Sequence, residues 1–170
     1  MGTIKIEDDC LAPERFMSLT YSGKDPWGVG VKIAEITKPF FHVSSSGTNN
    51  WRLNWDDSGD PVTFYSLWWA KVKYSRFTTA WFRMKVQGEK RKTDNTGTFT
   101  LQMQANIETS FKAWNPVLRT GWLMYSYLFY NRVRRKMIEK CRNTMYNFRN
   151  DIKKHFDLEA TSPPAYGGFG

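Results

Sequence analysis

The chain has 170 residues, 41% of them hydrophobic and 16% aromatic, which fits one globular domain with a sizeable core. Its longest apolar run, Trp122 to Tyr130, is well below the roughly 20 residues that span a bilayer, and Met1 to Lys5 leads into a strand-like pattern rather than a signal peptide. A membrane-spanning chain is therefore not expected, and the sequence favours a cytoplasmic protein, either soluble or peripheral to a membrane. The net charge of +9 lies largely on Arg132 to Lys154, which suits nucleic acid, an anionic membrane or simply a solvated helix face.

The first third of the chain predicts one strand and two short helices. Thr3 to Glu7 alternates like a strand, and Asp8 to Phe16 is typical of a turn leading into a short helix that contains Pro13. Trp27 to Ile36 has apolar residues at helical spacing, and the following Lys38-Pro39 pair is expected to end that helix.

The middle of the chain predicts a run of antiparallel strands. The candidates are Phe40 to Ser45, Trp51 to Trp55, Val62 to Tyr74, Thr79 to Gly88 and Thr98 to Glu108. In the last two, alternate residues form one continuous apolar face, and the opposite face is polar apart from Trp81, so the sheet has one apolar face that needs a cover. The terminal helix is the only predicted element long enough to cover it.

That helix is predicted to begin at Asn115-Pro116 and to run to about Phe156, within the segment Asn115 to Leu158. Steps of three and four residues trace one apolar stripe, formed by Leu123, Tyr127, Tyr130, Arg134, Met137, Ile138, Cys141, Met145, Phe148, Ile152 and Phe156. We expect this stripe to pack on the apolar face of the sheet.

The sequence offers no constellation for covalent or metal catalysis. Cys10 and Cys141 have no disulfide or metal spacing, and Cys141 reads as an apolar residue of the helix face. His42 and His155 are isolated, so neither has a partner at the spacing of a metal site. We expect no cofactor and no metal, and a catalytic role is uncertain, with the balance against an enzyme.

The order of the elements resembles the START-like helix-grip fold of the SRPBCC superfamily, which includes polyketide-cyclase-like and lipid-transfer proteins. The resemblance covers Thr3 to Leu158 and rests on Ala12-Pro13-Glu14-Arg15-Phe16 after the first strand, the Gly88/Gly97 hairpin and the final helix. It implies an α+β domain at residues 1–158, in which a curved antiparallel β-sheet grips a long C-terminal α-helix around an internal hydrophobic cavity. The Pro/Gly-rich residues 159–170 are expected to form a flexible tail.

The expected function is the binding or transfer of a hydrophobic ligand, such as a lipid or an isoprenoid quinone, in that cavity. The candidate ligand-binding residues are Trp55, Phe82, Met84, Phe99, Leu101, Met103, Tyr127, Tyr130, Arg134 and Ile138. The competing interpretation is that these side chains merely fill the core. Arg134 either anchors the polar head of the ligand or extends its guanidinium to the edge of the domain.

Several residues of the helix start lie off the stripe and predict a second contact surface. They are Trp122, Tyr125, Leu128, Phe129, Arg132, Arg135 and Lys136, and they suit an anionic membrane or a protein partner, unless the early helices cover them. A basic accessory subunit of a larger protein or ribonucleoprotein complex is the alternative, supported by Lys90-Arg91-Lys92 and by Trp68 to Tyr74. Nucleic acid is less favoured because no known reading motif is present, and a cyclase- or hydratase-type enzyme stays possible on this fold.

Overall fold

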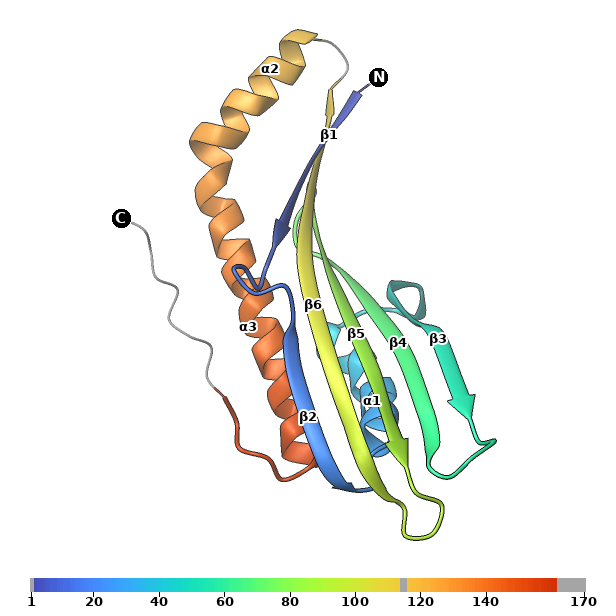
Figure 1. The fold of residues 1–170 in the computed structure, drawn as a ribbon. Helices are drawn as coiled ribbons and strands as arrows, with labels where there is room; N and C mark the ends of the chain where they lie inside the picture. The colour runs from blue at the N-terminus through green and yellow to red at the C-terminus, as the bar shows by residue number, and fades with distance from the viewer. Residues whose placement is uncertain (1, 114–115, 162–170) are drawn as a thin grey trace.

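The computed structural model describes residues 2–113 and 116–161 and has an α+β fold (Figure 1). Within these residues six strands form one curved antiparallel sheet, and a long C-terminal helix packs on it. The strands are β1 (Gly2–Asp9), β2 (Met17–Lys24), β3 (Thr48–Asp56), β4 (Val62–Lys73), β5 (Thr78–Lys90) and β6 (Thr96–Ala113). The helices are α1 (Gly28–Phe41), the short η1 (Ser45–Gly47), α2 (Pro116–Tyr125), the π-helical turn η2 (Ser126–Tyr130) and α3 (Asn131–His155).

The strand order is β1-β6-β5-β4-β3, and β2 also pairs with β6. β1 pairs with the second half of β6 and β2 with the first half, while β5 occupies the opposite edge along nearly the whole strand. β1 and β2 therefore share one edge of β6 and are separated by residues 10–16. This arrangement makes β6, the 18-residue strand, the centre of the sheet.

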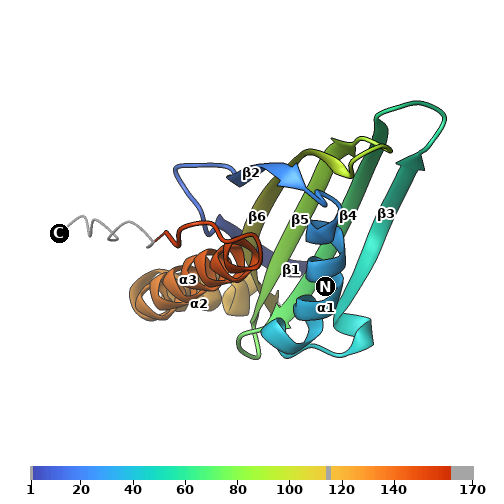
Figure 2. The same cartoon turned by 90° about the horizontal axis from the view of Figure 1, so that it is seen from below.

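The core lies between one face of the sheet and the two helices α1 and α3, which cover the same face (Figure 2). Phe82 and Met84 of β5 and Leu101 and Met103 of β6 are fully buried, as the alternating pattern predicted. On α3 the buried residues are Cys141, Met145, Phe148 and Ile152. The predicted packing of this half of the stripe against the sheet is confirmed.

The predicted helix at Pro13 is wrong, because residues 10–16 form turns and the chain then enters β2. Met17 and Leu19 of β2 are buried and alternate with exposed Ser18 and Thr20, which is the pattern of an edge strand with one apolar face. The same short alternation is visible in the sequence and is the local signal for this strand.

The predicted end of the second helix and the predicted strand Phe40 to Ser45 are also wrong. α1 continues through Pro39 to Phe41 and ends where His42 adopts a left-handed conformation with φ of 52°. Phe40 and Phe41 both contact Phe148, with ring centroids 5.1 and 5.2 Å apart. Burial of these two rings offsets the one backbone hydrogen bond that a proline removes from a helix.

The spacing of the two cysteines predicted no disulfide, and this prediction is also wrong. Cys10 and Cys141 are bonded to each other across a sequence separation of 131 residues, and both are buried. Cys10 lies where β1 ends and Cys141 lies in the buried half of α3. The disulfide therefore ties the loop between β1 and β2 to the helix that covers the sheet.

Candidate functional site

A single π-helical turn changes which side of the terminal helix faces the sheet. η2 inserts one extra residue into the helix, which rotates the preceding residues by about 100° relative to α3. Leu123 and Tyr127 of the predicted stripe are consequently exposed, Tyr127 to 81%, and their predicted packing on the sheet is wrong. Trp122, one position earlier than Leu123, packs on the sheet instead.

Trp122 belongs to a cluster of rings at the end of the sheet. Its ring stacks on Phe111 of β6 at 4.8 Å and meets Phe77, which precedes β5, edge-on at 5.5 Å. Tyr130 packs against Phe111 at 5.7 Å, and its hydroxyl lies 2.6 Å from the Thr78 hydroxyl. The ring contacts hold α2 against β6 at this end, and the hydroxyl contact between Tyr130 and Thr78 attaches η2 to the start of β5.

Beside this cluster is an apolar pocket of about 490 Å³ that opens on the surface. It is lined by Phe77, Val117, Leu118, Gly121, Trp122 and Tyr125. Its volume lies in the range typical of small-molecule sites, and its lining is almost entirely apolar. Gly121 leaves open space, because a Cβ atom at that position would meet no atom within 4 Å.

Around the pocket, α2 and the start of α3 expose apolar side chains on several sides. The large hydrophobic residues exposed there are Val117, Leu118, Leu123, Met124, Tyr125, Tyr127, Leu128 and Val133. α1 lies on the other half of the sheet, so the alternative that early helices cover this region is wrong (Figure 1). Isolated exposed apolar residues are ordinary in proteins, but eight of them between Val117 and Val133 are a concentration that is typical of an interaction surface.

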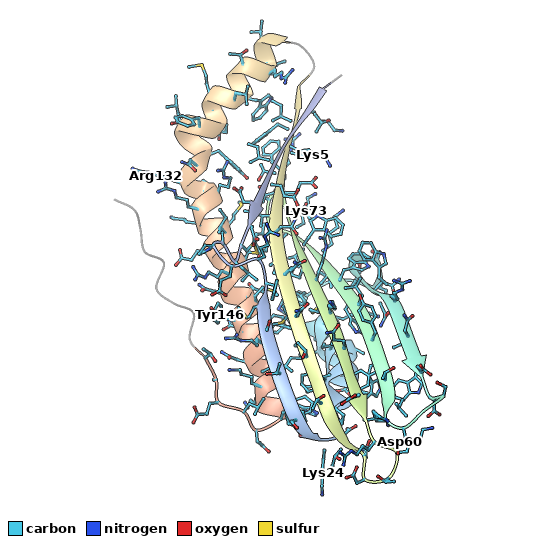
Figure 3. All side chains as sticks on the ribbon, viewed as in Figure 1. Lys5, Lys24, Asp60, Lys73, Arg132 and Tyr146 are labelled. Carbon is cyan, nitrogen blue, oxygen red and sulfur yellow. A yellow bond between two sulfur atoms is a disulfide. The ribbon has the colours of Figure 1, made fainter. Side chains whose placement is uncertain are left out.

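The charged residues of this segment of the chain are all positive. The sequence contains no Asp or Glu from Thr109 to Ile138, although it contains six Lys and Arg residues there. Arg132, Arg135 and Lys136 are exposed on the first turns of α3, and Arg132 extends from the side of the helix that faces away from the sheet (Figure 3). We name the exposed apolar residues together with Arg132, Arg135 and Lys136 the helix-tip surface.

The sequence-predicted surface residues map onto this region with two qualifications. Leu128, Arg132, Arg135 and Lys136 are exposed, and Tyr125 is exposed while lining the pocket. Trp122 is half-buried by its ring contacts, and the side chain of Phe129 lies outside the described residues. Phe77 and Gly121 were missed, although a glycine within an apolar helical segment was a usable signal for a pocket.

The predicted ligand-binding residues lie in different parts of the structure. Phe82, Met84, Phe99, Leu101 and Met103 lie in the core at 0–1% exposure. There they pack with one another and with α3. Their role in ligand binding stays a prediction, and the competing interpretation, that they fill the core, agrees with this burial.

Three of the other predicted ligand-binding residues lie away from that core centre. Trp55 is 43% exposed on β3, where it contacts Trp27 at 5.3 Å and lies under the ammonium of Lys90. Ile138 is half-buried at the edge of the core and Tyr127 is exposed. The structure therefore does not bring the ten predicted residues together around one space.

Arg134 has a partner that the sequence did not indicate. Its Nε lies 3.1 Å from Oδ2 of Asp8 on β1, and the two side chains are 25% and 21% exposed. The contact is an ion pair whose N–H is not aligned as a hydrogen bond. A half-buried charge on the apolar stripe is thus compensated by a carboxylate rather than by solvent alone.

Comparison with known proteins adds no functional information. No family model and no curated protein match the chain. A solved structure of a protein of unknown function from Staphylococcus aureus is similar over 92% of this chain and 98% of that one, with 9% identity and a TM-score of 0.24. An uncharacterized protein from Rhizobium leguminosarum is similar over 82% and 97%, with 7% identity and a TM-score of 0.23. Similarities this weak support no argument.

The described residues contain neither a membrane-spanning helix nor a cluster of metal ligands. No helix within residues 2–113 and 116–161 is long and apolar enough to cross a membrane. Within the same ranges, no group of three or more His, Cys, Asp and Glu side chains could hold a metal ion.

Proposed function

We propose that the protein docks on an anionic membrane through the helix-tip surface and binds the hydrocarbon chain of a lipid in the pocket beneath α2. The observation that carries this proposal is the exposure of eight large apolar side chains directly beside basic residues, in a segment without any carboxylate. Apolar side chains that enter the headgroup boundary, flanked by Lys and Arg, are typical of peripheral membrane proteins.

The charges fit a bilayer better than a neutral apolar partner. Each Lys or Arg near an anionic surface contributes about 1 kcal/mol to binding. Arg132, Arg135 and Lys136 together therefore change membrane partitioning by roughly two orders of magnitude. Trp122 and Tyr125 add rings with one polar edge, which suit the boundary between headgroups and acyl chains.

The pocket supports the lipid part of the proposal. It lies within the surface that would face the bilayer, so an acyl chain can enter it without crossing water. The helix-grip resemblance, in which the ligand lies between the sheet and the helix, remains a separate prediction. The position at α2 is preferred here because the pocket is open whereas the residues between α3 and the sheet are buried.

This proposal replaces the cytoplasmic location that the sequence favoured. Disulfides persist in oxidising compartments, and the buried Cys10–Cys141 bond favours such a compartment. We therefore propose docking on the membrane face that an oxidising compartment presents.

Flotation with vesicles tests the docking step. The protein is expected to float with phosphatidylcholine vesicles that contain phosphatidylglycerol at low salt, and to float poorly with phosphatidylcholine alone or at high salt. Arg132→Gln, Arg135→Gln and Lys136→Gln in one variant should reduce binding about 100-fold. The matched control is Arg52→Gln, Lys71→Gln and Arg83→Gln, which removes three exposed charges from the sheet and should bind normally. Absence of binding to anionic vesicles at low salt would refute the proposal.

Organic extraction and mass spectrometry of the purified protein test the pocket. Gly121→Leu is expected to fill the open space that Gly121 leaves, so that a co-purifying lipid is lost while flotation persists. Gly121→Ala is the control, since one methyl group leaves most of the volume free. A lipid retained by Gly121→Leu places the ligand elsewhere and separates pocket binding from membrane docking.

A further inference from the structure

The uncovered face of the sheet, opposite α1 and α3, carries a row of three tryptophans. They come from three neighbouring strands: Trp51 from β3, Trp69 from β4 and Trp81 from β5. Ring centroids are 6.4 Å apart between Trp51 and Trp69 and 5.8 Å apart between Trp69 and Trp81. The pairing of β3 with β4 shifts between Asn50 and Arg52, and Trp51 lies at this irregularity, 66% exposed.

Basic side chains lie between and beside these rings on the same face. The register pairs Lys71 with Trp81 and Trp69 with Arg83, so cations and rings alternate along and across β4 and β5. The ammonium of Lys71 is 4.9 Å from the centre of the Trp81 ring, a cation–π contact. Lys85 and Arg52 extend the charge along β5 and β3, and Lys73 lies on the same face of β4 (Figure 3).

These cations have no acidic partner within the described parts of the chain. The ion pairs there are Lys5 with Glu108, Lys92 with Asp57, and Arg134 with Asp8. On the outward positions of β4 and β5 from Tyr65 to Lys73 and from Thr79 to Gln87 there is no Asp or Glu. A sheet face that served only to keep the protein in solution would not need three tryptophans, and Trp and Arg are enriched where a partner binds.

Amide side chains on β6 continue this face. Gln104 pairs with Arg83 and Gln102 pairs with Lys85, so both glutamines point outward with the cations. Each amide carries a hydrogen-bond donor group and an acceptor, which match the edges of nucleobases. Rings, cations and amides thus occupy adjacent positions on one open surface.

We propose that this face, defined by Trp51, Trp69 and Trp81 with Arg52, Lys71 and Arg83, binds single-stranded nucleic acid. Flat rings give bases a stacking surface, and the cations beside them neutralise the phosphates. A duplex hides the faces of its bases, so stacking on tryptophan selects a single strand. The site is separate from the helix-tip surface, and the proposal does not depend on membrane docking.

Fluorescence anisotropy with a labelled 20-nucleotide oligothymidine at low salt tests the proposal directly. Binding is expected to quench tryptophan emission and to weaken steeply with salt. Trp51→Ala, at the most exposed ring, should weaken binding about 5- to 100-fold, which is the effect of losing one stacked base. The variant Arg52→Gln, Lys71→Gln, Arg83→Gln should lower the slope of log affinity against log salt by about 2, since each phosphate contact on a single strand contributes about 0.7.

The matched control is the helix variant Arg132→Gln, Arg135→Gln, Lys136→Gln, which removes the same charge from another surface. It should bind the oligonucleotide normally while failing to float with vesicles. Circular dichroism confirms that each variant is folded. The proposal is overturned by absence of oligonucleotide binding, by equal affinity for a duplex of the same length, or by binding that Trp51→Ala leaves unchanged. Binding to heparin without binding to the oligonucleotide would also overturn it, because the partner would then be an anionic polysaccharide.

Discussion

The two halves of the terminal helix differ in what their apolar residues do. From Cys141 to Ile152 the apolar side chains of α3 are buried against the sheet, and α1 covers the adjoining part of the same face. From Val117 to Leu128 they are largely exposed, although the helix carries more apolar residues there. The same residue types therefore stabilise the fold in one half and form a surface in the other.

The difference follows from what each half meets across the sheet. The buried half lies opposite β5 and β6 where both strands present continuous apolar faces, and the disulfide fixes it to the end of β1. Among the described residues, the exposed half contacts the last part of β6 and the Phe77 ring, and the π-helical turn orients the half-buried Trp122 toward that contact. Apolar periodicity alone thus does not show that a helix is covered.

The largest expected effect is a substitution that compares the two halves directly. Phe148→Ala removes a fully buried ring that contacts Phe40 and Phe41, and should lower the free energy of unfolding by about 3–5 kcal/mol. Leu128→Ala, at a side chain that is 61% exposed, should change it by less than about 0.5 kcal/mol. Urea denaturation measures both. A loss of stability at Leu128 comparable to that at Phe148 would show that the helix tip is part of the core.

The disulfide should provide the next largest effect. Cys10→Ser with Cys141→Ser opens a covalent loop of sequence separation 131, and the loss of this constraint on the unfolded chain should cost about 2–4 kcal/mol. The double variant avoids leaving one free thiol in the core. Urea denaturation of the oxidised protein and of the double variant gives the difference. Equal midpoints would mean that packing alone holds the loop between β1 and β2 on α3.

Much of the buried half could be predicted from the sequence, because strict alternation in β5 and β6 and the spacing of Cys141, Met145 and Phe148 each depend on local pattern. The exposed half could not, since η2 arises where Tyr130 reaches Thr78 and Trp122 reaches Phe111, contacts between residues distant in sequence. The sequence therefore predicted the residues of the candidate surface but not the pocket that some of them line. The sequence did not predict the tryptophan row for the same reason, because the row forms only when three strands pair.

Arg134 lies between the two halves of the helix, and a double-mutant cycle with Asp8 measures the interaction energy of their ion pair. Arg134→Met should cost about 1–2 kcal/mol, between the values for exposed and buried ion pairs, because it leaves the half-buried Asp8 carboxylate without its cation. Adding Asp8→Asn should restore most of that loss. Additive effects of the two changes would contradict a direct interaction. If Arg134 instead anchors a ligand head group, Arg134→Met should also weaken binding of the co-purified ligand by about 1.5–3 kcal/mol.

The tail at residues 159–170 was predicted to be flexible, and residues 162–170 lie outside the described residues, as does the predicted N-cap Asn115. Thr161 itself is described and hydrogen-bonds through its backbone to the side chain of Asn150 on α3. The last described residue of the chain is therefore attached to the buried half of the helix rather than to its exposed tip.

The smallest expected effect comes from Tyr74, at the end of β4, which packs on the buried half of α3. Burial raises the pKa of its phenol above the ordinary value of 10.0. The ammonium of Lys140 on α3 lies 4.9 Å from the centre of the Tyr74 ring. A raised pKa means that the folded protein keeps the proton after the unfolded chain has lost it. The contribution of Tyr74 to stability is then fully present below pH 10 and declines as the pH rises through the pKa of the folded state.

Tyr74→Phe removes this decline. Urea midpoints of the two proteins, which share the same disulfide, should run parallel below pH 10, and above it the wild-type midpoint should fall relative to the variant. Parallel curves over the whole range would show that the phenol is solvated and that this end of β4 is open to water.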